Sequence, residues 1–294
     1  MRNYMVLSGT PSEEFLSAAE ELNRTERIEE AEIIIGEPSH EELAEAKNLR
    51  WLQMTWAGAD RYMNRFPENV VLTTASGAFG ETIAEHALAM LFALCRRLPA
   101  YARRNDWVDL GCEKEIAGAT ALIFGAGDIG TEIAKRLKLF GVQTIGVCQD
   151  LRKPREGFDI RTNLENAAAF LSQADFLLCA LPHNAQTAGY LNEERLSWMK
   201  DDAILVNVGR GSFIDTCALE KCLAEGKFFG VGLDVAEQEP LDKQSSLWDH
   251  PNVIITPHVA GVSMGHLKST EQKIWHICAE NLKNYLQNNR SEMW

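Results

Sequence analysis

The sequence predicts an α/β protein of two domains, one of which contains a doubly wound parallel sheet. Its 294 residues exceed what a single hydrophobic core usually serves. Short apolar runs alternate with helical patterns along the chain, as they do in parallel βα units. In the second half these runs are almost continuously apolar, which is typical of a sheet covered on both faces.

The first series of apolar runs predicts a small α/β layer over residues 1 to about 80. Strands are expected within YMVLSG, AEIIIGEPS, RWLQMTWAGAD and VVLTTASG. Helical patterns occupy PSEEFLSAAEELN and EELAEAKNL, between the first three strands.

A helix is expected over Thr82–Leu98, which ends in a basic turn before Pro99. Its apolar residues lie on more than one face, so it needs cover from the other domain or from a second subunit. We predict a homodimer contact here, and an interdomain core helix is the alternative.

The second series lies between residues 119 and 258, with strands expected in ATALIFGAG, QTIGVC, ADFLLCAL, DAILVNVG, FFGVGLDV and NVIITPH. A long amphipathic helix follows at about His266–Asn288 and could return the chain to the first layer. We therefore predict a discontinuous substrate-binding domain, 1–82 with 263–294, and a dinucleotide-binding domain, 83–262.

The formal charge of −13 disfavours nucleic acid and anionic membrane surfaces as partners. Seven cysteines without a CxxC pair are expected to be buried thiols of a reducing compartment, and we predict no metal site. The amino terminus lacks a signal-peptide profile, and the longest apolar stretch, Ala87–Leu94, is too short to span a bilayer. A cytoplasmic enzyme is expected.

A dinucleotide site is predicted where ALIFGAGDIGTEIAKRL carries Gly125, Gly127 and Gly130 between a strand and a helix. The three glycines suit a tight turn, close approach of the backbone to a pyrophosphate, and helix-to-strand packing. The N–H groups at Asp128 and Ile129 then face the phosphates at the helix amino terminus. This pattern indicates a Rossmann-type sheet.

The choice between NAD and NADP depends on the register of TIGVCQDLRKPR. With Cys148 at the strand tip, no acid is placed to bind the ribose hydroxyls, and the cations from Arg152 onward favour NADP. If the strand continues for two more residues, Asp150 takes the place of that acid and NAD is favoured. The sequence leans slightly to NADP.

Three further segments end at predicted strand ends and carry Arg210, Glu239 and His258. Reduction of a 2-keto acid by hydride needs a proton donor, and histidine titrates near neutrality. A neighbouring carboxylate, here Glu239, would orient the imidazole and favour its protonated form. The Arg210 guanidinium would hold the carboxylate or carbonyl of a small anionic 2-keto acid.

The chain resembles the D-isomer-specific 2-hydroxyacid dehydrogenase family over essentially its full length. The motifs that carry the resemblance are TWAGAD, AEHALAMLFALCRRLP, GAGDIG, LPHNAQTAGYLN, NVGRGSFIDTCALEKCLAEG, GVGLDVAEQEPL and TPHVAG. The resemblance implies an NAD(P)-dependent oxidoreductase with a smaller flavodoxin-like substrate domain, in which Arg210, Glu239 and His258 are catalytic. It also implies that amides around Gly58 and Ala59 hold the substrate carboxylate across an interdomain cleft.

The same resemblance completes the expected cofactor contacts. The predicted cofactor-binding residues are Gly125, Gly127, Asp128, Ile129, Gly130, Gln149, Asp150, Arg152, Leu181, Pro182, His183, Val208, Gly209 and Asp234. Asp215 is interpreted as a helix N-cap and His86 as a packed helical histidine.

Within the family, PLDKQSSLWDHPNVIITPHVAG is most similar to the glyoxylate and hydroxypyruvate reductase branch, which commonly prefers NADPH. An alternative function is a dinucleotide-sensing binding protein with little turnover, similar to the C-terminal-binding-protein corepressors. The intact trio of Arg210, Glu239 and His258 favours the enzyme.

Overall fold

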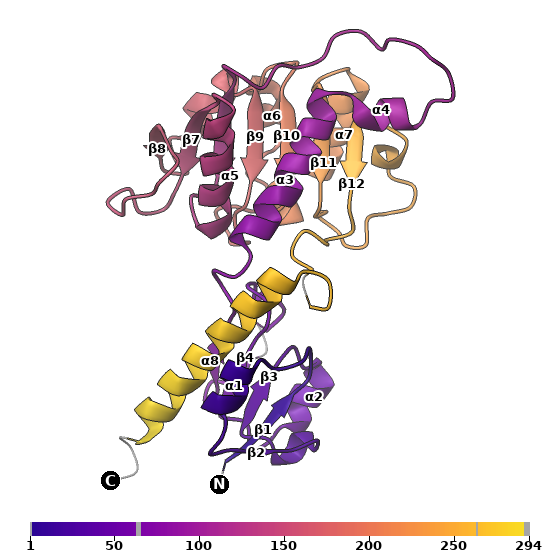
Figure 1. The fold of residues 1–294 in the computed structure, drawn as a ribbon. Helices are drawn as coiled ribbons and strands as arrows, with labels where there is room; N and C mark the ends of the chain where they lie inside the picture. Colours follow the sequence, from indigo (N-terminus) through magenta and orange to yellow (C-terminus); the bar gives the residue numbers. More distant parts are fainter. Residues whose placement is uncertain (1, 63–65, 263, 291–294) are drawn as a thin grey trace. The chain divides into compact units, whose positions relative to one another are not determined.

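The computed structural model describes residues 2–62, 66–262 and 264–290, and the chain divides into two compact units. Unit 1 consists of Met1–Phe79 and Val262–Trp294, and unit 2 of Gly80–Gly261. Each unit contains one sheet of parallel strands (Figure 1). The predicted α/β class is confirmed.

The sheet of unit 2 has seven strands among the described residues, in the order β12-β11-β10-β9-β6-β7-β8. All its neighbours pair in parallel, so every strand ends at the same edge. The strands are β6 (Thr120–Phe124), β7 (Gln143–Val147), β8 (Ile160–Thr162), β9 (Phe176–Cys179), β10 (Ile204–Asn207), β11 (Gly230–Leu233) and β12 (Val253–Ile255).

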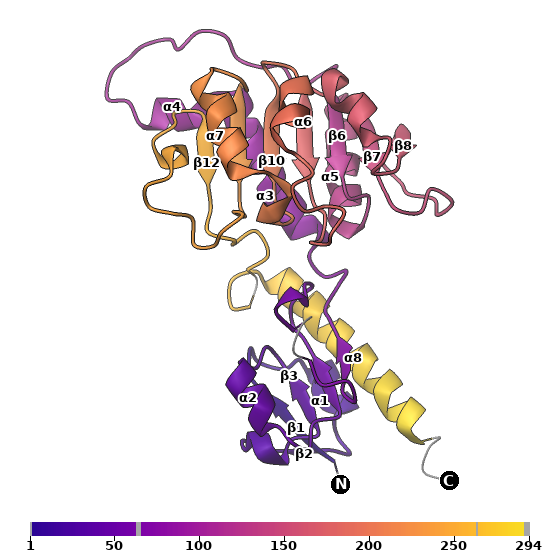
Figure 2. The same ribbon diagram turned by 180° about the vertical axis from the view of Figure 1, so that it is seen from behind.

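Two hydrophobic layers cover the two faces of this sheet. Alternate strand residues point to opposite faces, so Leu122 and Phe124 join one layer while Ala121 and Ile123 join the other. Helices α3 and α5 cover one face in Figure 1, and α6 and α7 the other in Figure 2. The helical segments are α3 (Gly80–Cys95), α4 (Leu98–Ala102), α5 (Asp128–Leu139), η3 (Ala167–Gln173), α6 (Glu193–Trp198), η4 (Gly211–Phe213), α7 (Thr216–Ala224) and η5 (Ser246–Trp248).

Helix α3 is covered by elements of its own unit. The helix packs on α5, β10 and β11 of its own unit, which buries apolar side chains on more than one of its faces. A helix wedged between a sheet and a neighbouring helix is apolar on two sides, so its pattern does not by itself require cover from another domain or subunit. The homodimer contact expected at this helix stays a prediction.

Helix α7 begins as predicted at Asp215, whose carboxylate accepts the amide N–H of Ala218 at 2.9 Å. This N-cap satisfies one of the free N–H groups of the first turn. The structural role expected for Asp215 is confirmed.

Unit 1 contains a five-stranded sheet in the order β2-β1-β3-β4-β5. This is the strand order of flavodoxin-like folds, whose ligand sites lie at the carboxyl ends of β1 and β3. Its elements are β1 (Asn3–Val6), α1 (Glu13–Ala18), β2 (Asn23–Arg24), η1 (Ile28–Glu30), β3 (Ile33–Ile35), α2 (His40–Glu45), β4 (Trp51–Gln53), η2 (Asp60–Tyr62), β5 (Val71–Thr73) and α8 (Lys268–Arg290).

Helix α8 returns the chain to unit 1, as its amphipathic pattern indicated. Its Trp275 packs edge-on against Phe15 of α1, with ring centroids 5.3 Å apart. One face of α8 also stacks Tyr285 on Trp51 of β4 at 4.8 Å. Aromatic pairs of this kind stabilise a helix beyond its buried area.

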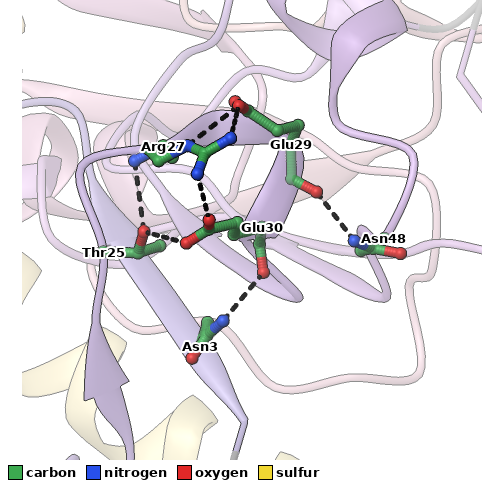
Figure 3. A network of polar contacts seen from close by, with 6 residues as sticks. All are labelled: Asn3, Thr25, Arg27, Glu29, Glu30 and Asn48. Carbon is green, nitrogen blue, oxygen red and sulfur yellow. Dashed lines mark hydrogen bonds and ion pairs between the residues drawn. The ribbon is translucent and has the colours of Figure 1, made fainter.

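Strand β2 is a two-residue edge strand that the sequence pattern does not reveal. A polar network holds the segment that follows it (Figure 3). Arg27 bonds Glu29 at 2.7 Å and Glu30 at 2.8 Å, while the carbonyl of Glu30 accepts Asn3 Nδ2 at 3.3 Å. Side-chain contacts, rather than apolar periodicity, therefore fix this edge.

The cysteines are all free thiols, but the expectation that they are buried is wrong for two of them. Exposed Cys112 and Cys217 lie on a connecting segment and on the outer side of α7. Cys148 is partly buried, and the buried thiols are Cys95, Cys179, Cys222 and Cys278.

Candidate active site

The glycine loop after β6 has the backbone that close approach of a dinucleotide requires. Gly125 has φ +103°, and a Cβ there would lie 2.8 Å from the carbonyl oxygen of Ala180. A Cβ on Gly130 would overlap the carbonyl of Gly125. Only glycine fits at these two positions.

Gly127 is the N-cap of α5, and the position that its Cβ would take faces open space, with no atom within 4 Å apart from the adjoining chain. The first N–H groups of a helix have no partner inside the helix, so α5 offers them, with the positive end of its dipole, to an anion. The residues present therefore fit a dinucleotide pyrophosphate.

The Asp128 side chain lies against Gly80, a contact that the sequence analysis does not predict. Its carboxylate lies directly against Gly80, the first residue of α3, where a side chain on residue 80 would overlap it. The carboxylate thus faces α3, and any contact of Asp128 with phosphate would come from its main chain. Ile129 packs partly against the core beneath the loop.

At the predicted ribose end, β7 stops at Val147 and the amide of Cys148 still pairs with Thr162 O at 2.9 Å. Asp150 lies beyond the strand, where its carboxylate accepts both the main-chain N–H and Nε of Arg152 at 3.0 Å. The Arg152 guanidinium lowers the pKa of Asp150. Gln149, which lies between Cys148 and Asp150 in the sequence, is exposed.

Two further loops at the same sheet edge carry the remaining predicted cofactor contacts. Gly209 lies so close to Leu181 that a Cβ would be 2.7 Å from the Leu181 carbonyl oxygen. His183 Nδ1 pairs with Ser212 Oγ at 2.7 Å. The loops after β9 and β10 therefore form one packed wall, which also contains the exposed Pro182 and the buried Val208.

Arg210 follows β10 and is held through its main chain. The carbonyl of Arg210 accepts Nδ2 of the fully buried Asn207 at 3.0 Å, and Asn207 Oδ1 accepts the N–H of Gly209 at 3.1 Å. The guanidinium donates from Nη1 to Gly209 O at 2.9 Å. The buried side-chain amide of Asn207 thus fixes the position of the Arg210 main chain.

His258 and Glu239 form the pair that the sequence analysis describes. Nδ1 of His258 lies 2.8 Å from Oε2 of Glu239, and the other carboxylate oxygen accepts the N–H of Ala236 at 3.1 Å. Both side chains are partly exposed, at 49% and 41%. The contact directs Nδ1 towards the carboxylate and leaves Nε2 for another partner.

Strand order brings the three loops that carry Arg210, Glu239 and His258 to neighbouring positions on one sheet edge. Arg210 follows β10, Glu239 lies in the loop after β11, and His258 follows β12, and these three strands are neighbours. The carboxyl edge of an open α/β sheet is where such folds bind ligands.

Asp234 has a role that the resemblance did not predict. Its side chain is only 1% exposed, and it accepts the N–H groups of Val259 and Ala260 at 2.9 and 3.0 Å. Thr256 Oγ1 donates to the same carboxylate at 2.6 Å. Asp234 therefore anchors the loop that carries His258, and its predicted cofactor contact stays a prediction.

Sequence reasoning missed Glu37, which follows β3 at the carboxyl edge of the unit 1 sheet. Its carboxylate accepts the N–H groups of Thr55 and Trp56 at 2.7 and 3.1 Å, and so fixes the start of the TWAGAD loop that carries Gly58 and Ala59. Burial raises the pKa of Glu37 above its ordinary value near 4.5. An acidic residue two positions after a buried strand was the available signal.

Replacing Glu37→Gln should increase the free energy of unfolding at pH values above the folded-state pKa of Glu37 and not in acid. Because the folded-state pKa is raised, the wild type loses stability as pH rises from the unfolded value through the folded one. Glutamine can still accept the two amides and carries no charge. In urea unfolding from pH 4 to 8, the free energy of unfolding of the variant should rise relative to that of the wild type as pH rises. A difference that does not change with pH would contradict the prediction.

No group of three or more His, Cys, Asp or Glu side chains within residues 2–62, 66–262 and 264–290 is arranged to hold a metal ion.

Comparisons with known proteins agree with this geometry. Residues 88–260 match the NAD binding domain model of the D-isomer specific 2-hydroxyacid dehydrogenases. A glyoxylate reductase of Korarchaeum cryptofilum is 35% identical over 72% of this chain and 65% of its own length.

Solved structures extend the match to almost the whole chain. A D-isomer specific 2-hydroxyacid dehydrogenase family protein from Aeromonas salmonicida has a TM-score of 0.82 and 31% identity over 98% of this chain and 96% of its own. The NADPH-dependent glyoxylate/hydroxypyruvate reductase of Sinorhizobium meliloti, solved with NADP and sulfate, has a TM-score of 0.75 and 26% identity over 92% of each chain. With its glycine loop and its paired His258 and Glu239, the chain thus belongs to the D-isomer specific 2-hydroxyacid dehydrogenase family and is an NAD(P)-dependent oxidoreductase.

Proposed function

We propose that this protein reduces a small 2-keto acid of the glyoxylate or hydroxypyruvate type to the D-2-hydroxy acid, with Arg210, Glu239 and His258 as catalytic residues. The observation that carries the proposal is the 2.8 Å pair between His258 and Glu239 at the sheet edge that also bears the glycine loop. The glyoxylate reductases among its relatives support the substrate class.

In this proposal each side chain has one task. Arg210 binds the anionic substrate and fixes its carbonyl through its planar guanidinium. Glu239 holds Nδ1 of His258, and Nε2 donates a proton to the carbonyl oxygen as negative charge develops there. The nicotinamide supplies the hydride when bound. Predicted amides at Gly58 and Ala59 would bind the substrate carboxylate.

A panel of 2-keto acids, each assayed with NADH and with NADPH, tests the proposal. We expect oxidation of the reduced nicotinamide with glyoxylate or hydroxypyruvate. Tight dinucleotide binding without turnover of any keto acid would contradict it and would favour the corepressor-like function, which the reductase relatives do not favour.

We propose NADPH as the preferred cofactor, since β7 ends before Asp150 and Arg152 already pairs with that acid. The Arg152 side chain is 92% exposed and can turn to a 2′-phosphate. Arg152→Ala should raise KM for NADPH roughly tenfold, the value of one charge-assisted hydrogen bond. KM for NADH should stay nearly constant. An equal rise for both cofactors would contradict this role.

We also propose a homodimer that uses the segment around α4. Leu98 and Val108 are half-exposed there and Trp107 is fully exposed. Exposed large apolar side chains in one segment of the chain favour a protein partner. Trp107→Glu should convert the dimer to a monomer in sedimentation velocity, whereas Trp198→Glu on α6 should not. A wild-type monomer, or a variant that stays dimeric, would contradict this interface.

No helix in the described ranges combines the length and the apolar character needed to cross a membrane.

The substrate proposed here is a small anion, and in a chain of net charge −13 its attraction depends on local groups such as Arg210.

A further inference from the structure

Helix α3 runs along β11. Helix residues four positions apart therefore contact strand residues two positions apart. Leu94 lies against Gly230, where a Cβ would be 2.8 Å from its side chain, and Met90 lies 3.1 Å from the corresponding position of Gly232. One turn further, Nε2 of His86 lies 3.6 Å from Oδ1 of Asp234, the residue that follows the strand. The helix thus delivers an imidazole to the carboxyl edge of the sheet.

The hydrogen bonds there determine which way the protons point. Thr256 Oγ1 lies 2.6 Å from Asp234 Oδ1 and 3.0 Å from His86 Nε2. A hydroxyl has one proton, and the carboxylate can only accept it. Thr256 Oγ1 must therefore accept from His86, whose Nε2 carries a proton.

The chain of bonds continues to the proposed proton donor. Asp234 accepts the main-chain N–H groups of Val259 and Ala260 through its carboxylate, and its own carbonyl accepts the N–H of His258 at 2.7 Å. His258 has φ +56°, a left-handed conformation that is uncommon for residues other than glycine.

We propose that His86 is a positioning residue for the reaction, acting through Thr256 and Asp234 to hold the His258 loop in its reactive conformation. The proposal rests on the proposed function, because it assigns His258 as proton donor. His86 fixes the Thr256 hydroxyl on the buried carboxylate, and the satisfied carboxylate keeps the loop amides and the left-handed turn in place.

The test compares His86→Leu, which removes the donor, with His86→Gln, which can still donate to Thr256, and with Glu85→Gln on the exposed side of the same turn. With NADPH and hydroxypyruvate, His86→Leu should lower kcat about tenfold, because small displacements of a reacting group are costly. KM for NADPH should stay within about twofold of the wild type and His86→Gln should restore most of kcat, because the loss lies in the donor of one hydrogen bond.

A double-mutant cycle separates positioning from a general loss of structure. Thr256→Val breaks the same chain at its next link, so the double variant should be no slower than the slower single variant. Losses that multiply, or a wild-type kcat in His86→Leu, would overturn the proposal. Thermal unfolding of each variant shows whether the fold is retained, and Thr256→Val provides the second variant if His86→Leu does not fold.

Amide hydrogen exchange distinguishes failure of this proposal from failure of the proposed function. Exchange at Val259 and Ala260 should be faster in His86→Leu than in Glu85→Gln, whether or not the protein turns over a keto acid. Equal exchange in the two variants would overturn the proposal. If the wild-type protein turns over no keto acid, the proposed function is wrong, and so is the catalytic role assigned to the His258 loop.

Discussion

His258→Gln should lower kcat by about 10²- to 10⁴-fold, the usual contribution of a positioned acid. Glutamine can still bond Glu239, so the loop should keep its conformation while the transferable proton is lost. KM for the cofactor should change little, because the glycine loop after β6 is untouched. Steady-state rates with hydroxypyruvate and NADPH measure the effect.

The matched control is His276→Gln in unit 1, where an exposed histidine pairs with Glu14 at 3.0 Å. It should retain the wild-type rate. Full activity of His258→Gln would mean that another group provides the proton, and the assignment of His258 would be wrong.

Arg210→Gln should lower kcat/KM by about 10²- to 10³-fold, comparable with the loss of one preorganised donor to developing charge. The guanidinium is proposed to bind the anionic substrate, and glutamine offers neither its charge nor its fork of donors. Arg210→Lys should recover part of the loss, because the charge returns without the planar geometry.

Saturation kinetics with the keto acid should show the effect of Arg210→Gln mainly as a higher KM if the guanidinium binds the carboxylate. A fall mainly in kcat would indicate that it stabilises the carbonyl oxygen. Lys221→Gln, an exposed cation on α7, serves as the control. If Arg210→Gln turns over the keto acid as fast as this control, Arg210 has no part in the reaction.

The features that the sequence predicted are those that repeat or that need a particular residue type. The glycines at 125 and 130 are readable because no other residue fits their backbone or their packing. Arg210, Glu239 and His258 are readable because parallel strands bring their loops to one edge of the sheet. The family assignment follows from these features together.

The missed features depend on single contacts between distant segments. Strand β8 has three residues, and its approach is held by Asp159, which accepts the N–H of Thr144 at 2.9 Å, rather than by an apolar pattern. Glu37 and Thr55 are 18 positions apart, and His86 and Thr256 are 170 apart. Helical periodicity shows that a residue lies on a face, but not which turn of the helix reaches a strand end.

The two roles of Asp234 illustrate the same limit. The strand LDV predicts a buried acid at a strand end, and the resemblance assigns that acid to the cofactor. Its observed bonds to Thr256, Val259 and Ala260 hold the His258 loop, a role that the resemblance does not include. Asp234→Asn should therefore speed amide hydrogen exchange in the His258 loop as well as weaken cofactor binding.

The configuration of the product is the most direct test of the central claim, that Arg210, Glu239 and His258 act together on a keto acid. Chiral chromatography of the product formed from hydroxypyruvate and NADPH should show D-glycerate from the wild type and only traces from His258→Gln. L-glycerate from the wild type, or an equal yield from the variant, would contradict the account.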